Sequence, residues 1–252
     1  MHQTEYWNAV AEEKEFTTIL NVSMFSKYVS KNSKILDVGC GYGRILNELY
    51  ENGFNDLTGV DTAENMIKRG KREYPYLNLI ANQDGKIPFN NNIFDVVILF
   101  GVLTCIPDDE FQQDFLKEVE RVLKPQGIIY VNDFLLNRGF KNWLEYKKAE
   151  KETGVYGVFE THDGVTVRQH KESYISKLLS NFKKLEYKKS VIPTMNGGKS
   201  NSFEFIGRLE KVHRLRLINT YFKCIIMLKR EYNIKDVKRG QKWFLTHSIK
   251  ST

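Results

Sequence analysis

Glycines and carboxylates occur together along the first third of the chain, and both residue types suit the binding of a nucleoside. Gly39, Gly41 and Gly43 alternate after an apolar run at 35–38, where the backbone must turn tightly. Apolar residues at helical spacing follow from Ile45 onwards. A strand, a glycine turn and a helix form the start of a nucleotide-binding βαβ unit, whose helix N-terminus favours an anionic group.

The spacing of the glycines distinguishes between nucleotides. A dinucleotide fingerprint, G-x-G-x-x-G, would place its third glycine at position 44, which is Arg44. The chain has G-x-G-x-G instead, with Asp37 in the strand before it. This pattern argues against NAD and favours S-adenosylmethionine (SAM), which has no pyrophosphate but offers a carboxylate, an amine, a ribose and an adenine.

Two further carboxylates follow predicted strands. Asp61 ends the apolar run 57–61, and we expect it to accept hydrogen bonds from both ribose hydroxyls. Asp84 follows the run 77–81 and can accept from the adenine amino group. The three glycines taken alone could equally form a tight turn that binds no ligand. The ordered set of glycines and acids at successive strand ends is much stronger evidence.

With these residues the chain resembles the class I SAM-dependent methyltransferases, especially the small-molecule type with a Methyltransf_11/25-like core. The resemblance covers residues 34–133 closely. Residues 35–43 are similar to motif I of that family, 59–67 to motif II, and 84–97 to motif III and the start of strand four. Gln126 stands where the family usually has a glycine, which changes only a surface turn.

The resemblance and the alternation of strand and helix patterns predict an α/β fold. We expect a doubly wound, Rossmann-like sheet of about seven strands with an antiparallel edge hairpin, plus a C-terminal extension. The expected strands are 34–38, 57–61, 77–81, 94–100, 127–133, about 184–192 and 203–207, with helices at 43–52, 63–73, 109–123 and 171–182. The expected regions are an N-terminal helical lid segment at 1–33, a SAM-binding core at 34–133, a substrate cap at 134–170, a closing helix and edge hairpin at 171–211, and a basic, apolar extension at 212–252.

The resemblance implies SAM as the cofactor and S-adenosylhomocysteine as its product. The expected cofactor contacts are Asp37, Gly39, Cys40, Gly41, Asp61, Thr62, Met66, Asp84, Gly85, Phe100 and Val102. The expected substrate and lid residues are Tyr6, Trp7, Thr104, Tyr156 and Arg168. Plain hydrophobic docking of the N-terminal aromatic residues on the core is an equal alternative to a lid.

Methyl transfer from a sulfonium is an in-line displacement with a neutral leaving group, so the enzyme mostly aligns the reactants and excludes water. A base is needed only if the acceptor must lose a proton. His170 and Glu160 in the cap are the candidates, with ordinary surface polarity as the alternative. Many relatives have a histidine where this chain has Thr104 or Cys105. No second Cys or His stands at ligand spacing from Cys105, so we expect no metal and a packed thiol.

Basic charge is concentrated in the last segment of the chain. Residues 211–252 hold eleven Lys or Arg and two acids, a net charge of +9, whereas the whole chain carries +7. The core is therefore slightly acidic. The segment is also rich in apolar residues, which fits a helix packed on the core or on a second subunit, a nucleic-acid contact, or a poorly ordered extension.

These features leave three functions open. A small-molecule acceptor is favoured because 134–170 resembles a cap; an RNA methyltransferase using 212–252 and a non-catalytic SAM-binding scaffold are the alternatives. A homodimer through the extension is also compatible with the sequence. The sequence has no apolar run of membrane-spanning length, no signal-peptide pattern and only three scattered cysteines, so we expect a cytoplasmic protein.

Overall fold

The computed structural model describes residues 3–83, 86–195 and 197–210, and every structural statement below concerns these residues. The helices are α1 (Gln3–Ala9), α2 (Val22–Ser26), α3 (Arg44–Glu51), α4 (Glu64–Glu73), α5 (Asp109–Val122), α6 (Phe140–Thr153) and α7 (Glu172–Leu178), with a short 3-10 helix η1 (Leu103–Cys105). The strands are β1 (Lys34–Val38), β2 (Asp56–Asp61), β3 (Asn78–Ala81), β4 (Phe94–Phe100), β5 (Leu123–Phe134), β6 (Val158–Glu160), β7 (Thr166–Arg168), β8 (Phe182–Pro193) and β9 (Lys199–Leu209).

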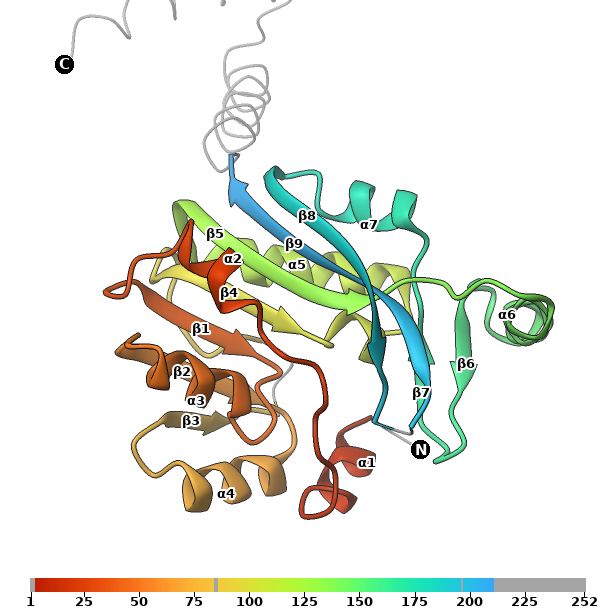
Figure 1. Ribbon diagram of the computed structural model, residues 1–252, viewed down its shortest axis with the longest axis horizontal. Coiled ribbons are helices and arrows are strands. Elements are labelled where there is room, and N and C mark those ends of the chain that lie inside the picture. Colours follow the sequence, from red (N-terminus) through yellow and green to blue (C-terminus); the bar gives the residue numbers. More distant parts are fainter. Residues whose placement is uncertain (1–2, 84–85, 196, 211–252) are drawn as a thin grey trace, which may run out of the picture. The chain divides into compact units, whose positions relative to one another are not determined.

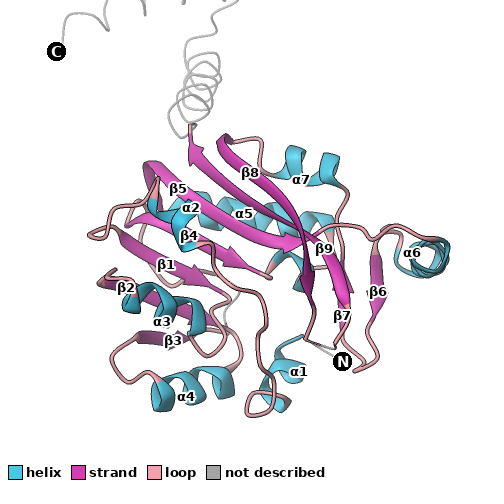
Figure 2. Ribbon diagram, in the orientation of Figure 1, coloured by secondary structure: helices cyan, strands magenta, loops and turns pink. Residues whose placement is uncertain are grey.

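The main sheet has seven strands in the order β3-β2-β1-β4-β5-β9-β8 (Figure 1). The first five are parallel to one another, whereas β9 pairs antiparallel with both β5 and β8. Helices lie on both faces of the sheet (Figure 2). The predicted doubly wound sheet of seven strands with an antiparallel edge hairpin is confirmed.

The central strands form because their side chains are apolar on both faces. Leu36 of β1, Val97 and Ile98 of β4 and Ile129 of β5 are fully buried. Parallel strands covered by helices on both sides require such continuous apolar runs. The parallel register then brings the carboxyl ends of β1, β2 and β4 together, which is where a doubly wound sheet binds its ligand.

Several predicted boundaries were wrong, and two of them have a clear physical reason. The strand expected at 127–133 begins at Leu123, because Leu123 pairs with Phe94 before the register shifts. Gln126 lies in this shifted stretch with a φ of 66°, a left-handed conformation that explains why glycine is common at that point. The closing helix, expected at 171–182, ends at Leu178, and Phe182 already pairs in β8.

The region expected to form a cap has a small sheet of its own. Strands β6 and β7 pair antiparallel as a separate two-stranded sheet, with α6 beside them (Figure 1). Tyr146 anchors α6, because its hydroxyl donates to Gln169 Oε1 and accepts from the backbone N–H of Asn137 at 3.1 Å. The substructure is thereby tied to the end of β5 and to the segment after β7.

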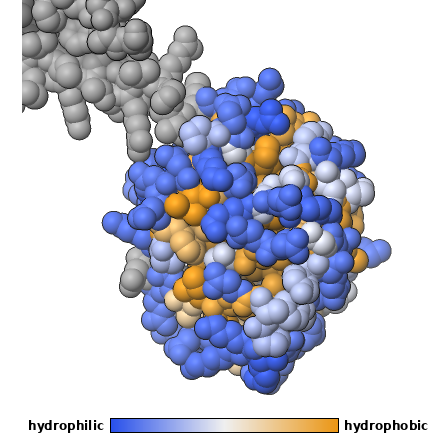
Figure 3. All heavy atoms as spheres, turned by 90° about the vertical axis from the view of Figure 1, so that its left-hand side faces the viewer, coloured by the Kyte–Doolittle hydropathy of each residue, from blue (hydrophilic) through white to orange (hydrophobic). Residues whose placement is uncertain are grey.

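Hydrophilic residues make up most of the rim of the face shown in Figure 3, with apolar patches between them. Within the described ranges, no helix has the length and apolar content needed to cross a bilayer. The predicted extension at 212–252 lies outside the described residues, as do Asp84 and Gly85.

One contact between a helix and the glycine turn has a measurable consequence for stability. A Cβ atom on Gly70 of α4 would lie 2.5 Å from the carbonyl oxygen of Tyr42. Exchange of Gly for Ala inside a helix normally stabilises by about 1 kcal/mol. We expect Gly70→Ala instead to lower the free energy of unfolding by about 2 kcal/mol, because the backbone contact must open. Urea unfolding measures this change.

The matched control is Gly198→Ala, since Gly198 is exposed and its nearest neighbour would be the Thr194 hydroxyl at 3.3 Å. Equal midpoints for Gly70→Ala and the control would show that α4 does not approach the turn this closely.

Candidate active site

A large cavity of about 1440 Å³ opens at the carboxyl ends of β1, β2 and β4. One part of its wall comes from the glycine turn, the end of β2 and the turn after β4. The remainder comes from α1 and the segment after it, from the cap, and from the loop between β8 and β9. The cavity therefore lies where the doubly wound topology predicts a ligand.

The glycine turn presents bare backbone at the cavity. Gly39 and Gly41 have φ values of 75° and 56°. A Cβ on Gly39 would lie 2.7 Å from Val102, and one on Gly41 would lie 2.6 Å from the ring of Phe16. Only glycine fits both the dihedral angles and the space, so the turn can bring its backbone close to a ligand.

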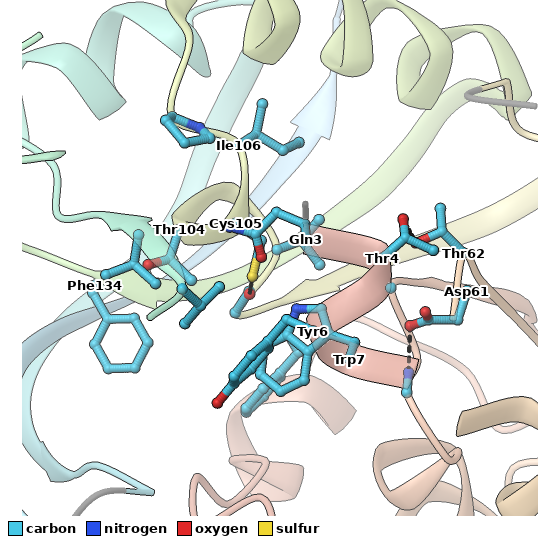
Figure 4. A pocket seen from close by; sticks show the side chains of 18 of the residues that line it. Gln3, Thr4, Tyr6, Trp7, Asp61, Thr62, Thr104, Cys105, Ile106 and Phe134 are labelled. Carbon is cyan, nitrogen blue, oxygen red and sulfur yellow. Dashed lines mark hydrogen bonds between the residues drawn. The ribbon is translucent and has the colours of Figure 1, made fainter. Parts of the chain in front are cut away.

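Asp61 connects the end of β2 to the glycine turn. Its Oδ2 accepts from the N–H of Gly41 at 2.8 Å (Figure 4), and its Oδ1 accepts from the N–H of Ala63 at 2.8 Å. Burial raises the pKa of this carboxyl, and the backbone N–H groups of Ala63, Gly41 and Thr62 oppose the shift. Each oxygen still has a free lone pair, so the carboxylate can accept two ribose hydroxyls.

Asp37 lies behind the turn and does not contribute to the cavity wall. Its side chain is 1% exposed, and neither carboxylate oxygen has a hydrogen-bond partner within the described residues. Burial raises the pKa of Asp37 to about 7, helped by the charge of Asp61. An unpartnered buried carboxyl favours a positive group nearby, and SAM carries two such groups, an ammonium and a sulfonium.

Most of the expected cofactor residues lie on the cavity wall. They are Gly39, Cys40, Gly41, Asp61, Thr62, Met66, Phe100 and Val102. Cys40 is buried, which raises the pKa of its thiol, and its sulfur packs where a Cβ on Gly59 would otherwise lie. It therefore fills space as a packed thiol.

The connection between α1 and α2 contributes several wall residues that were not predicted from the sequence. Phe16 stacks on Tyr42 with ring centroids 5.2 Å apart, directly over Gly41. The Arg44 guanidinium donates to the carbonyl of Thr18, which holds the same connection over the turn. These residues follow no periodic pattern in the sequence. The one available signal was Phe16, an aromatic residue between two predicted helical segments.

Helix α1 covers the middle of the cavity. Tyr6 and Trp7 lie between Asp61 and Thr62 on one side and Thr104 and Phe134 on the other (Figure 4). The side chain of Trp7 also packs near Phe16, with ring centroids 5.9 Å apart. The predicted lid residues thus lie on the cavity, between its two halves.

The lid segment is held at both of its sides. On the cofactor side, Arg69 of α4 donates to the carbonyls of Ala11 and Lys14 at 3.0 and 2.9 Å. On the cap side, the Tyr6 hydroxyl donates to Asp163 at 3.1 Å, and Lys14 forms an ion pair with the same carboxylate. The lid therefore bridges the nucleotide-binding half and the cap.

The half of the cavity beyond α1 is mainly apolar. Its walls include Ile106, Phe134, Phe159, Val165 and Val167. Polar groups stand farther along its wall, from α6 and from the end of β6: Glu145, Lys148, Glu152 and Glu160. The Thr104 side chain also lines this half, but its hydroxyl donates to the carbonyl of Arg168 at 2.8 Å.

His170, one of the two predicted bases, is 1% exposed and is not on the cavity wall. Its Nε2 lies 2.9 Å from Nε2 of Gln112, and its Nδ1 lies 3.2 Å from the carbonyl oxygen of Phe134. Since the Gln112 amide nitrogen can only donate, His170 accepts at Nε2 and donates from Nδ1. Burial lowers the pKa of His170 to about 4, so this neutral form persists. Both ring nitrogens are engaged, which fits a structural role.

Two further predicted substrate residues also point elsewhere. The Arg168 guanidinium donates to the carbonyl of Pro107 at 2.9 Å and pairs with Asp109 at 2.6 Å, so it supports the turn after β4 from behind. Tyr156 packs against the ring of Tyr146 with centroids 5.5 Å apart. Neither side chain is on the cavity wall.

Comparison with known proteins agrees with this geometry. Residues 36–131 match the family model described as "Methyltransferase domain". This core belongs to the class I SAM-dependent methyltransferases. The match spans the strands from β1 to β5, and it contains the glycine turn and Asp61, which line the cavity.

Relatives of the methyltransferase core have different acceptors in their names. A sterol 4-C-methyltransferase of Caenorhabditis elegans is 31% identical over 49% of this chain and 36% of its own length. A demethylmenaquinone methyltransferase of Staphylococcus epidermidis is 37% identical over 42% of this chain and 45% of its own. The chain spans less than half the length of these curated relatives.

Solved structures show that the similarity of fold extends beyond this core. A SAM-dependent methyltransferase from Methanosarcina mazei superposes with a TM-score of 0.69, at 23% identity, over 75% of this chain and 97% of the other. A didemethyltoxoflavin N1-methyltransferase of Burkholderia thailandensis, solved with S-adenosylhomocysteine, gives a TM-score of 0.54 at 15% identity, over 83% and 79% of the two chains.

The contacts of Asp61 predict its contribution to cofactor binding. We expect Asp61→Ala to weaken the binding of S-adenosylhomocysteine by about 2 kcal/mol, because a charge-assisted, two-fold acceptor is lost. Isothermal titration calorimetry measures the dissociation constant. Asp56→Ala is the matched control, since Asp56 begins the same strand and pairs with Lys34 away from the cavity. An unchanged affinity in Asp61→Ala would remove Asp61 from the cofactor site.

The burial of Asp37 predicts a pH dependence of stability without ligand. Its folded pKa is raised to about 7 from 3.8, so its favourable contribution is present below pH 3.8 and is lost as the pH rises through 7. Asn at this position stays neutral. The free energy of unfolding of Asp37→Asn, minus that of the unchanged protein, should therefore rise between pH 4 and pH 8 by more than about 1 kcal/mol.

Chemical denaturation at four pH values gives this difference, and taking the difference cancels the titration of Asp133 and His170, which both proteins share. A difference that is flat across the range would mean that Asp37 keeps an ordinary pKa in the folded protein.

Proposed function

We propose that the protein is a SAM-dependent methyltransferase whose acceptor is an apolar small molecule. The observation that carries the proposal is one cavity with two different halves. One half has the glycine turn and Asp61; the other has the apolar walls formed by residues such as Phe134 and Val167. Its volume of about 1440 Å³ exceeds the roughly 300–1,000 Å³ of an ordinary ligand pocket. Room for a cofactor together with an acceptor supports a transfer reaction.

In this proposal the described residues divide the work of binding the cofactor. Asp61 accepts from the ribose, the backbone of Gly39 to Gly41 lies against the amino-acid part, and Asp37 supplies negative charge behind it. The groups fit: a carboxylate on the wall, a turn that only glycine can form, and a buried carboxyl without a partner. SAM supplies a methyl group on a positively charged sulfur.

The remaining residues orient the acceptor and exclude water. Tyr6 and Trp7 line the cavity, and in this proposal they close it against solvent while the apolar walls hold the acceptor against the turn after β4. Alignment and desolvation are the main requirements of a displacement with a neutral leaving group. Glu160 is the predicted base that lines the cavity, and it would accept a proton if the acceptor must lose one. His170 is assigned a structural role.

The names of the relatives fit an apolar acceptor without selecting one. Sterols and demethylmenaquinone are both largely apolar molecules. A mouse protein named as an eEF1A lysine and N-terminal methyltransferase also matches, at 26% identity over 49% of this chain. The RNA alternative depended on residues 212–252, which lie outside the described ranges. The non-catalytic scaffold stays the alternative if the protein binds SAM without transferring its methyl group.

Methyl-labelled SAM tests the proposal directly. The purified protein is incubated with label and with a cell extract separated into apolar metabolites, water-soluble metabolites, protein and RNA. We expect label in the apolar fraction, where mass spectrometry identifies the product. Label confined to protein or RNA would overturn the proposed acceptor class while leaving the methyltransferase assignment intact.

A bulky substitution can block the acceptor half alone. Val167 of β7 is half-buried on the apolar wall, far along the chain from the glycine turn. We expect Val167→Trp to reduce methyl transfer at least about tenfold, because the added ring occupies space for the acceptor. The affinity for S-adenosylhomocysteine should stay within about twofold. Radiometric assay and calorimetry measure the two effects.

Val191→Trp is the matched control because Val191 is an exposed valine on β8 that does not line the cavity. A parallel loss of transfer and cofactor affinity in Val167→Trp would contradict the division of the cavity into two halves.

A further inference from the structure

Helix α6 is unusual among the described helices because it is almost entirely exposed. Tyr146 is the single buried residue among its fourteen. That residue anchors the helix through Gln169 and the backbone of Asn137. A surface helix normally buries a wide apolar stripe. The first turn of α6 is therefore free to contact something other than its own domain.

The first turn of α6 exposes large apolar side chains. Phe140 is 74% exposed, Trp143 is 47% exposed and Leu144 is 48% exposed. The rings of Phe140 and Trp143 stack on each other with centroids 5.7 Å apart. These three side chains form a continuous apolar surface rather than isolated exposed residues. Burying it elsewhere would be favourable.

The charges in the first turn of α6 are basic, and the exposed acid Glu145 follows directly after Leu144. Arg138 and Lys141 are both exposed, and the sequence from 138 to 144 contains no acidic residue. Neither side chain forms an ion pair with any other described residue. We call Arg138, Phe140, Lys141, Trp143 and Leu144 the aromatic–basic end of α6. Its composition combines apolar burial with attraction to negative charge.

We propose that the aromatic–basic end of α6 docks on an anionic lipid surface. Trp and Phe side chains are stable at the level of the lipid headgroups, and nearby Lys or Arg bind the phosphates. A helix that lies in the interface needs this combination of side chains. The opposite charge required of the partner excludes a neutral apolar surface, and it makes a second copy of the same basic end unfavourable.

The same helix forms part of the cavity wall. The cavity wall includes Glu145, Lys148, Ala149 and Glu152, which begin directly after the aromatic–basic end and extend about two turns beyond it. Docking by the first turn of α6 therefore places this side of the cavity near the lipid surface. An apolar acceptor dissolved in the bilayer would then have a short path to the site, a consequence that rests on the proposed function. The docking itself does not.

Vesicle binding of the full chain tests the proposal. Co-sedimentation with phosphatidylcholine vesicles, with and without about one third phosphatidylglycerol, is measured at about 0.15 M salt and again at 0.5 M salt. High salt screens charge attraction, including any from residues 211–252, but leaves apolar insertion in place. We expect the unchanged protein to bind the anionic vesicles. The triple variant F140S/W143S/L144S should bind them at least about tenfold more weakly at both salt concentrations.

The matched control is the double variant Tyr50→Ser/Tyr76→Ser. These tyrosines are another exposed and stacked aromatic pair, 45% and 50% exposed with centroids 4.5 Å apart, on the opposite part of the sheet. We expect it to bind vesicles as the unchanged protein does. Calorimetry with S-adenosylhomocysteine on each variant should give one affinity, which separates loss of docking from damage to the methyltransferase site.

Three results would overturn the proposal: no binding of the unchanged protein to anionic vesicles, equal binding by the triple variant, or an equal loss in the tyrosine control. A change from dimer to monomer in the triple variant, with vesicle binding retained, would instead identify the patch as a subunit interface. Absence of methyl transfer would not affect any of these outcomes.

Discussion

The site depends on one interaction, the hydrogen bond from the N–H of Gly41 to the carboxylate of Asp61. It joins the turn after β1 to the end of β2, two places 20 residues apart in the chain. The parallel pairing of the two strands brings them within reach, and the glycine dihedral angles turn the N–H inwards. A carboxylate fixed in this way by backbone donors needs little rearrangement to receive a ribose.

The fold, and the residues that line the cavity at the glycine turn, could be predicted because local sequence determines both. Continuous apolar runs specify buried parallel strands, and the spacing from Gly39 to Gly43 excludes a dinucleotide turn. The boundary errors have a different origin. Leu123 joins β5 because Phe94 is its partner, and no local pattern records that pairing. Tertiary contacts decide strand ends more than propensity does.

The half of the cavity beyond α1 was harder to predict because it is assembled from distant segments. His170 and Arg168 have the residue types of a catalytic site, but their side chains turn towards Gln112, Pro107 and Asp109. Successive side chains of a strand point to opposite faces, so neighbouring residues differ in whether they line the cavity or are buried behind its wall. Val167 and Phe16, by contrast, reach the cavity as ordinary apolar residues that composition alone does not distinguish.

The lid contacts two parts of the protein at once, and this has a kinetic consequence. Moving α1 away from the cavity requires loss of the Arg69 hydrogen bonds on one side and of the Asp163 contacts on the other. A single opening therefore exposes both halves of the cavity together. Exchange of spent cofactor and release of product would share one gate, so the lifetime of the closed state would set an upper limit on turnover.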